Sequence, residues 1–194
     1  EAGSSILDFL LGDNDTISPD RGVFLNKTFR LHPKINEFIS ENFYENRLQA
    51  DEKTSKRKIS FNDKCTIQSE GIHYLPINHK DNIQTSIEEC EEVKKLVTQF
   101  VGLNYYDGEK DRKLTIEDIL IISPYNAQVN ALKFQLGDKN AKVGTIDKFQ
   151  GQEAPITIIS MASSDSETLP RNKEFFFNRN RLNVAISRAQ CVSI

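Results

Sequence analysis

Apolar residues follow two spacings along the 194-residue chain, one typical of strands and one typical of helices. Residues 119–122 (Ile-Leu-Ile-Ile) form a continuous apolar run of strand length, as in a parallel strand buried on both faces. Other segments repeat apolar residues every three or four positions, as an amphipathic helix does. The pattern predicts helices at 4–11, 33–44, 86–101, 126–136 and 175–189. It predicts strands at 23–25, 72–77, 119–122, 143–146, 156–161 and from 191 onward.

Strand and helix alternate along the sequence without internal repeats or low-complexity segments. This order is typical of an α/β domain with a mostly parallel central sheet and helices on its faces. Residues 50–70 and 104–113 are polar and rich in turn formers, so both are predicted as irregular surface segments. We therefore expect a single α/β domain over residues 1–194.

The predicted helix at 86–101 carries the clearest local start signal. Ser86 is followed three residues later by Glu89, which is the pattern of a capping box. In that motif the serine hydroxyl accepts from the N–H of the glutamate, and the glutamate side chain accepts from the N–H of the serine. We expect both hydrogen bonds at the start of this helix.

The charge balance excludes a uniformly basic nucleic-acid binder, because 25 basic residues face 28 acidic ones and the formal net charge is −3. A local basic strip is compatible with that total. The three cysteines lie far apart without metal-ligand spacing, and we predict free thiols in a reducing compartment. The chain has no 18-residue apolar run and no signal-type start, so we predict a cytoplasmic protein without membrane contact. Because the chain begins with Glu1 rather than Met, we expect a fragment of a larger protein.

The sharpest candidate motif is residues 143–153, Val-Gly-Thr-Ile-Asp-Lys-Phe-Gln-Gly-Gln-Glu. Its polar residues cluster around a glycine between two predicted strands, where polar groups are costly unless they have partners. A hydrogen-bonded turn would explain Asp147 but not the whole string. We expect these groups at the carboxyl end of the sheet, where open α/β folds bind ligands.

Three further segments carry candidate chemistry: 29–33 (Phe-Arg-Leu-His-Pro), 123–128 (Ser-Pro-Tyr-Asn-Ala-Gln) and 181–189 (Arg-Leu-Asn-Val-Ala-Ile-Ser-Arg-Ala). Taken singly, each has an ordinary explanation as a core phenylalanine with a surface arginine, a strand-ending turn, or a solvated helix face. Arg181 and Arg188 are seven positions apart, which puts them on one helical face roughly 10 Å apart. The order of all four segments is more informative than any one of them.

Together these motifs resemble the second RecA-like domain of superfamily 1 helicases of the Upf and senataxin type. The start of the chain and its 180–190 segment also resemble bacterial proteins that join a RecB-like nuclease to such a helicase. The resemblance covers nearly the whole chain. It implies a RecA-like fold of the P-loop NTPase class and an ATP-dependent helicase or translocase that moves on single-stranded nucleic acid. It does not distinguish DNA from RNA.

The resemblance assigns five residues to the nucleotide. Phe29 would stack on the base, and Arg30 would reach the γ-phosphate with its planar fork. Glu153 would accept from a ribose hydroxyl, and Gln150 would bridge the nucleotide and nucleic-acid sites. Arg188 would be the arginine finger that stabilises the transferring phosphate. The family more often has Gln-Tyr-Arg where this chain has Thr-Phe-Arg.

Three further residues are assigned to the nucleic-acid backbone. Ser123 and Tyr125 follow a predicted buried strand and precede a helix, and helix N-termini suit phosphate groups. Thr145 would lie near the backbone at the start of the 143–153 motif. Backbone contacts of this kind position a strand without reading its sequence.

The chain lacks one half of an ATP site. It contains no G-x-x-x-x-G-K-[ST] motif, since Lys27-Thr28 has no preceding glycine, and no Asp-Glu strand end for Mg²⁺ is recognisable. The resemblance therefore implies that ATP–Mg²⁺ is held mainly by an N-terminal RecA-like domain of the same protein. We expect this chain alone to be inactive.

Two alternative hypotheses fit the residues less well than a motor domain. A catalytically inert module with the same fold would need neither Arg30, Glu153 nor Arg188, and all three are intact. A nuclease half is disfavoured, because no clustered carboxylates with a catalytic lysine are present. The basic clusters at 56–58 (Lys-Arg-Lys) and 171–179 are predicted to be solvated surface.

Overall fold

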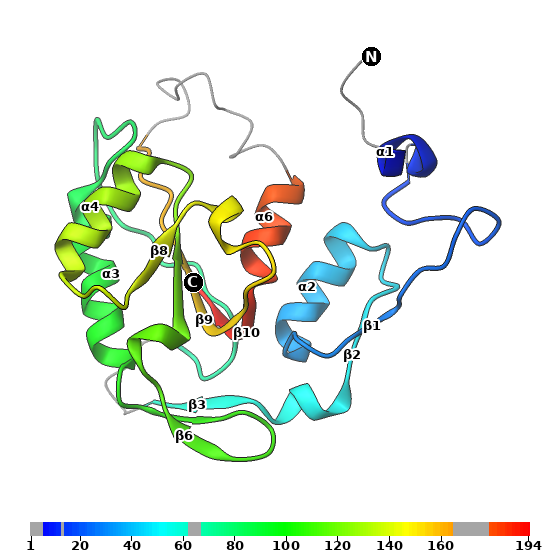
Figure 1. The fold of residues 1–194 in the computed structure, drawn as a ribbon, viewed down its shortest axis with the longest axis horizontal. Coiled ribbons are helices and arrows are strands. Elements are labelled where there is room, and N and C mark those ends of the chain that lie inside the picture. The colour runs from blue at the N-terminus through cyan, green and yellow to red at the C-terminus, as the bar shows by residue number, and fades with distance from the viewer. Residues whose placement is uncertain (1–5, 13, 62–66, 165–178) are drawn as a thin grey trace.

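The computed structural model describes residues 6–12, 14–61, 67–164 and 179–194, and its centre is a five-stranded sheet (Figure 1). The strand order is β4-β10-β9-β7-β8, and every pairing is parallel. The strands are β4 (Gly71–Ile72), β7 (Ile119–Ile122), β8 (Lys142–Gly144), β9 (Ala154–Ile159) and β10 (Ala189–Ser193). The predicted α/β class with a parallel sheet is confirmed.

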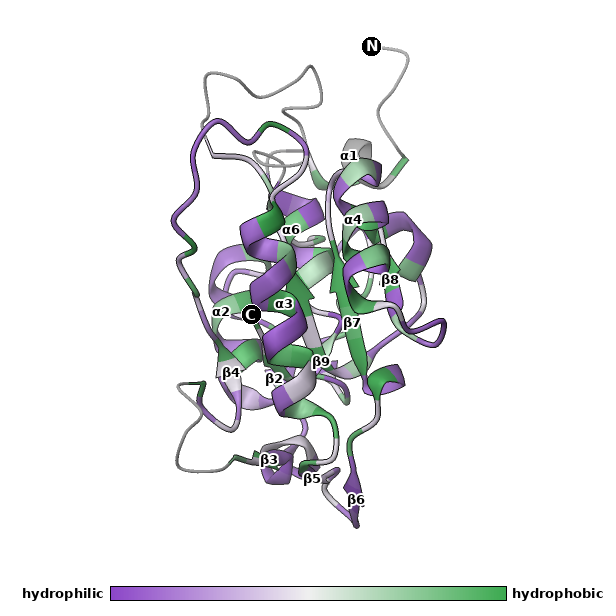
Figure 2. Cartoon of the chain, turned by 90° about the vertical axis from the view of Figure 1, so that its left-hand side faces the viewer, coloured by the Kyte–Doolittle hydropathy of each residue, from purple (hydrophilic) through white to green (hydrophobic). Residues whose placement is uncertain are grey.

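Helices cover both faces of this sheet. Alternate residues of the buried strand β7 pack to opposite sides: Ile119 and Ile121 join the core that contains α3 and α4, whereas Leu120 and Ile122 join the core beside α6. A third cluster joins α2 to α6 and to the start of β10. Figure 2 shows β7, β8 and β9 as hydrophobic segments between helices whose colours alternate. The helices are α1 (Ile6–Leu11), α2 (Pro33–Phe43), α3 (Ile87–Phe100), α4 (Asn126–Leu136) and α6 (Arg179–Ile186).

Local sequence signals placed the helices well. The predicted helices at 4–11, 33–44, 86–101 and 126–136 are each present within two residues of their expected ends, and part of the predicted 175–189 helix lies outside the described residues. The predicted strand at 23–25 is wrong, because Val23 and Leu25 are 86% and 81% exposed and the two-residue strand β1 (Lys27–Thr28) follows them. The strand expected at 72–77 is reduced to β4. In the part of the chain that the structure describes, no helix is long and apolar enough to span a membrane.

The two segments predicted as irregular surface instead build a second sheet. Strands β3 (Lys58–Ser60), β5 (Asn104–Tyr106) and β6 (Asp111–Lys113) pair antiparallel in the order β3-β5-β6. Short elements precede it: β2 (Gln49–Ala50), which pairs with β1, and the 3₁₀ turn η1 (Glu52–Lys56). Each of β3 and β5 buries a single side chain, Ile59 or Tyr105, so neither carries the long alternation that announces a strand.

The capping box predicted at the start of α3 is half formed. The Ser86 hydroxyl accepts from the N–H of Glu89 at 3.1 Å, as expected. The Ser86 N–H, however, donates to Oε1 of Gln128 at 2.8 Å. The Glu89 carboxylate is turned away and accepts from the Ser160 hydroxyl at 2.5 Å and the Ala162 N–H at 2.9 Å. Tertiary partners therefore replaced the second local hydrogen bond.

The described cysteines are buried and free, as the sequence predicted. Burial raises the pKa of Cys90 to about 11 and that of Cys191 to about 12, so both thiols stay protonated near neutral pH. Cys65 lies outside the described residues.

Candidate nucleotide site

The predicted nucleotide residues lie at the amino end of the parallel strands. Glu153 immediately precedes β9 and Arg188 immediately precedes β10, while Ser123 and Thr145 follow β7 and β8. The expectation that all of these polar groups share the carboxyl end is therefore wrong. Between Thr145 and Glu153 the chain makes the 3₁₀ turn η3 (Ile146–Phe149). It then returns to the amino end of the strands, as a crossover between parallel strands must. The 143–153 motif thus runs from the carboxyl end of the strands to their amino end.

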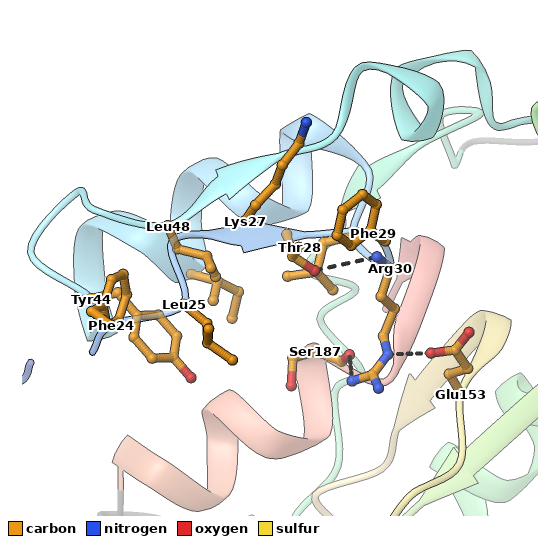
Figure 3. Close-up of a pocket in the computed structure, with 12 residues that line it drawn as sticks. Phe24, Leu25, Lys27, Thr28, Phe29, Arg30, Tyr44, Leu48, Glu153 and Ser187 are labelled. Carbon is orange, nitrogen blue, oxygen red and sulfur yellow. Dashed lines mark hydrogen bonds and ion pairs between the residues drawn. The ribbon is translucent and has the colours of Figure 1, made fainter. Parts of the chain in front are cut away.

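An arginine and a carboxylate from distant parts of the chain meet at the amino edge of the sheet, where its parallel strands begin. The Nε of Arg30 forms a short ion pair with the Glu153 carboxylate, and an Nη of Arg30 donates to the carbonyl of Ser187 at 3.4 Å. Figure 3 shows the Arg30 guanidinium between Glu153 and Ser187. Both side chains of the pair remain partly open, at 36% and 40% exposed. The site is therefore accessible to a ligand.

Glu153 has a second hydrogen-bond partner, which the sequence does not predict. The side-chain amide of Gln190, in β10, donates to the other Glu153 oxygen at 2.7 Å. Burial alone would raise the pKa of Glu153, but the hydrogen bonds from Arg30 and Gln190 outweigh it and lower the pKa. The carboxylate is therefore held ionised and oriented from two sides.

Arg188 lies just beyond the end of α6, so it does not share a helical face with Arg181 as predicted. One Nη of Arg188 donates to the carbonyl of Gln152 at 3.3 Å. Its Nε is buried and has no hydrogen-bond acceptor among the described residues. Burial lowers the pKa of Arg188, and the nearby positive charge of Arg30 adds to that effect. Arg188 also lines a cavity, where its positive charge is suited to an anionic ligand.

Phe29 presents its ring to solvent at the rim of this site. The ring is 68% exposed. Phe29, Arg30, Glu153 and Ser187 together line a cavity of about 480 Å³. The ammonium of Lys27 lies 5.6 Å from the ring centroid and also pairs with Asp51 at 2.8 Å. An exposed aromatic ring beside a charged cavity suits a planar base.

Gln150 lies at the end of η3, between the two groups of predicted residues. It lines a second cavity of about 310 Å³ together with Arg181 and Arg188. Asp147, on the same cavity, approaches Arg181 at 3.8 Å. The structure therefore brings Gln150 near the arginine predicted to be the finger, whereas Arg30 lines the other cavity, beside Phe29 and Glu153.

The residues predicted to contact nucleic acid are less accessible. Ser123 is fully buried, and its hydroxyl accepts a long hydrogen bond from the N–H of Tyr125 at 3.5 Å. Tyr125 is 6% exposed. Thr145 is half-buried at the start of η3 and makes no capping hydrogen bond there. Of the three, Thr145 has the side chain that is most available at this edge.

Other predicted features of the chain are placed as follows. Among the described residues, no three His, Cys, Asp or Glu side chains gather as a metal site would require. Most of the predicted basic cluster at 171–179 lies outside the described residues, apart from Arg179. Arg179 donates to the carbonyl of Asn42 and approaches Asp15 at 3.7 Å, so it connects α6 to α2 and the amino-terminal segment.

Comparison with known proteins identifies the family. Residues 4–194 match the family described as AAA domain. The chain is 30% identical to the DNA polymerase alpha-associated DNA helicase A of Schizosaccharomyces pombe, over 85% of this chain and 26% of that protein. It is 29% identical to an uncharacterized ATP-dependent helicase of Methanocaldococcus jannaschii, over 89% of this chain and 26% of that protein. It is 28% identical to the probable RNA helicase armi of Drosophila melanogaster, over 86% of this chain and 15% of that protein.

The chain spans about a quarter or less of the length of these relatives. They give no support to the resemblance to bacterial nuclease–helicase fusions, and they include helicases named for DNA and for RNA. They do support the resemblance to Upf-type and senataxin-type helicases, which the parallel sheet and the arrangement of the motifs already favoured. The chain therefore belongs to the AAA domain family, and its similarity to these helicases supports the second RecA-like domain that the sequence predicts.

Proposed function

We propose that this chain is the carboxyl-terminal motor domain of a larger ATP-dependent helicase, and that it supplies one wall of the ATP site. The observation that carries the proposal is the cluster at the amino edge of the sheet, where Arg30 and Arg188 flank the single carboxylate of Glu153. Two guanidinium groups against one carboxylate leave a net positive charge. A polyphosphate carries the charge that would balance it.

The residues of this chain fit the nucleotide part by part. The exposed ring of Phe29 would stack on the base, and Glu153 would accept from a ribose hydroxyl. Arg30 would contact the γ-phosphate, and the guanidinium of Arg188, which lines the neighbouring cavity, would approach charge that develops on the transferring phosphate. ATP with Mg²⁺ would supply the phosphoryl group and its charge neutralisation, with the metal held by an N-terminal RecA-like domain.

The Arg30–Glu153 ion pair implies an exchange of partners on nucleotide binding. Both groups satisfy each other in this structure, although the proposal assigns one to phosphate and the other to ribose. Arg30 would therefore move from Glu153 to the phosphate, and Gln190 would keep the freed carboxylate oriented through its 2.7 Å hydrogen bond. The exchange conserves the number of charge-assisted hydrogen bonds, which keeps its energetic cost low.

Nucleic acid would bind at the opposite edge of the sheet. Thr145 lies there, and residues 145–153 run from that edge to Glu153 at the nucleotide edge. Gln150 occupies the middle of this connection and shares a cavity with Arg188. The proposed coupling between ATP and a single strand of DNA or RNA therefore has one short segment that contacts both sites.

A second function, an inert binding module, is favoured by one observation. Arg30, Gln190 and Glu153 already satisfy one another, as a purely structural ion-pair cluster would. The two functions differ in what removal of Arg30 does. A structural pair contributes mainly to folding, whereas a phosphate ligand contributes to hydrolysis.

The test is ATP hydrolysis by the full-length parent protein in the presence of single-stranded nucleic acid. Arg30→Ala should lower kcat/KM by about 100-fold or more with little change in the melting temperature, because the lost contact is to the reacting phosphate. Lys133→Ala, on the exposed face of α4, is the matched control and should leave kcat/KM unchanged. The isolated 194-residue chain should fold and show no hydrolysis. Unchanged kcat/KM in Arg30→Ala would favour the inert module.

A further inference from the structure

The basic cluster at 56–58, predicted to be solvated surface, contains one arginine with three main-chain partners. Lys56 and Lys58 are exposed, whereas Arg57 between them is half-buried. The Arg57 guanidinium donates through one Nη to the carbonyl of Arg30, through the other Nη to the carbonyl of Phe29 at 3.3 Å, and through Nε to the carbonyl of Asp107 at 3.2 Å. Two of these carbonyls belong to the residues proposed to contact the base and the γ-phosphate.

The segment that Arg57 holds has no regular structure of its own. Phe29 and Arg30 lie between the end of β1 and the start of α2, outside any helix or strand. Beyond Arg57, the N–H of Arg30 donates to the Thr28 hydroxyl at 3.3 Å. A short irregular segment that carries an exposed ring and a charged fork needs support from neighbouring elements to hold one conformation.

The third partner connects Arg57 to a rigid neighbour. Asp107 lies in the turn between β5 and β6, and its carboxylate accepts from the N–H groups of Glu109 and Lys110 at 2.9 and 3.0 Å. Lys58, the next residue after Arg57, pairs with Tyr106 in the β3–β5 ladder. The second sheet therefore fixes Arg57 on both sides, and Arg57 in turn reaches the segment of the nucleotide site.

We propose that Arg57 is a positioning residue for nucleotide binding and hydrolysis. It ties the main chain of Phe29 and Arg30 to the β3-β5-β6 sheet, and so fixes the stacking ring and the phosphate-binding guanidinium in one relative geometry. The inference rests on the proposed function of this site. Guanidinium chemistry is required, because only a planar fork of several N–H donors can reach three carbonyls at once, whereas a lysine ammonium is a single point.

The experiment measures ADP binding and ATP hydrolysis in the full-length parent protein. Arg57→Ala should lower kcat/KM for ATP about tenfold or more, since displacement of a catalytic group by about 1 Å can cost 100-fold. Arg57→Lys should recover little of this loss and should keep the melting temperature close to wild type, which makes it the decisive variant if Arg57→Ala fails to fold. Lys58→Ala, the exposed neighbour, should stay within about twofold of wild type, as expected for a solvated side chain.

A double-variant cycle separates positioning from a merely structural role. Phe29→Ala and Arg57→Ala should each weaken ADP binding, and the double variant should bind no more weakly than Phe29→Ala alone, because Arg57 acts on the base through Phe29. Losses that multiply in the double variant, or a wild-type kcat/KM in Arg57→Lys, would overturn the inference. If Phe29→Ala and Arg30→Ala themselves leave binding and hydrolysis unchanged, the proposed function fails instead, whatever Arg57 does.

Discussion

The polar groups differ between the amino edge of the parallel sheet, where its strands begin, and the carboxyl edge, where its strands end. At the amino edge, Arg30, Glu153 and Arg188 are charged and partly exposed, and the Nε of Arg188 has no acceptor among the described residues. At the carboxyl edge, several polar side chains are turned inward: Ser123 and Gln128 are fully buried. The same strands connect both edges. The difference indicates that the amino edge is prepared for a nucleotide, whereas the buried polar groups of the carboxyl edge support the fold beside the proposed nucleic-acid site.

The carboxyl edge is held by a continuous hydrogen-bond network. Gln128 bridges Ser86 to Ser160, with 2.9 Å from its amide to the Ser160 hydroxyl. Ser160 donates to Glu89, which also pairs with His79 at 3.0 Å. Fully satisfied buried networks fix one arrangement of the elements that they join. Here they join the starts of α3 and α4 to the end of β9.

The amino edge leaves a guanidinium donor without an acceptor among the described residues. This atom is the Nε of Arg188, and it belongs to a charged group that also lines a cavity. If the comparison is right, substitutions at the amino edge should change catalysis more than stability. Substitutions at the carboxyl edge should do the reverse.

The largest expected effect is at Arg188. In the full-length parent protein, Arg188→Ala should lower kcat for ATP hydrolysis about 10³-fold and leave nucleotide affinity within a few-fold, because the guanidinium acts mainly on charge that develops in the transition state. Arg188→Lys should not restore kcat. Steady-state hydrolysis assays measure both. Arg179→Ala, at the other end of α6, is the matched control, and wild-type kcat in Arg188→Ala would make Arg188 an ordinary surface residue.

At the carboxyl edge, Glu89→Ala should reduce the free energy of unfolding by about 2–4 kcal/mol, because it leaves buried donors from Ser160 and Ala162 without an acceptor. Urea unfolding of the 194-residue chain measures the change. Glu91→Ala, exposed on the same helix, should change stability by less than about 0.5 kcal/mol. If both variants lost the same free energy of unfolding, the buried hydrogen-bond network would not stabilise the fold at this edge.

A smaller effect is expected on nucleic-acid binding. Thr145→Ala should weaken binding of single strands roughly fivefold, the value of about one hydrogen bond. Ser123→Ala should affect stability more than affinity, because its hydroxyl is buried. Titrations with strands of different sequence at two salt concentrations should give weak, salt-dependent affinities that do not depend on sequence. Tight, sequence-selective binding by this chain would contradict the motor function and indicate a recognition module.

The smallest expected effect is the pH dependence of the Glu153 contribution. Its pKa is lowered in the folded chain, so its stabilisation is fully present above the unfolded value of about 4.3 and is lost as pH falls through the folded pKa. Glu153 is 40% exposed, and solvent screening should keep the contribution below about 1 kcal/mol. The free energies of unfolding of wild type and Glu153→Gln, measured with urea, should therefore differ slightly at pH 7 and converge as the pH falls below about 4.3 and through the folded pKa. A difference that grows on acidification would reverse the assignment.

Local patterns predicted the elements with strong periodicity and failed for those without it. The helix expected at 126–136 has those bounds, because its apolar spacing and the preceding buried strand are both encoded within a few residues. Strands β3 and β5 were missed, since each buries only Ile59 or Tyr105 and depends on pairing with a distant segment. The capping box at Ser86 was predicted with its first hydrogen bond correct. Its second was lost to Gln128, which is 42 residues away.

The sequence by itself determined the α/β class, most helices, and the identity of the residues that carry charge and aromatic rings in the motifs. These properties depend on side-chain type and short-range spacing, which the chain contains in full. Only the tertiary structure decided that Glu153 and Arg188 lie at the amino edge, that Arg30 pairs with a carboxylate 123 residues away, and that Arg57 supports Phe29. Those contacts depend on how crossovers return the chain to an edge of the sheet, and neighbouring residues carry no signal for that.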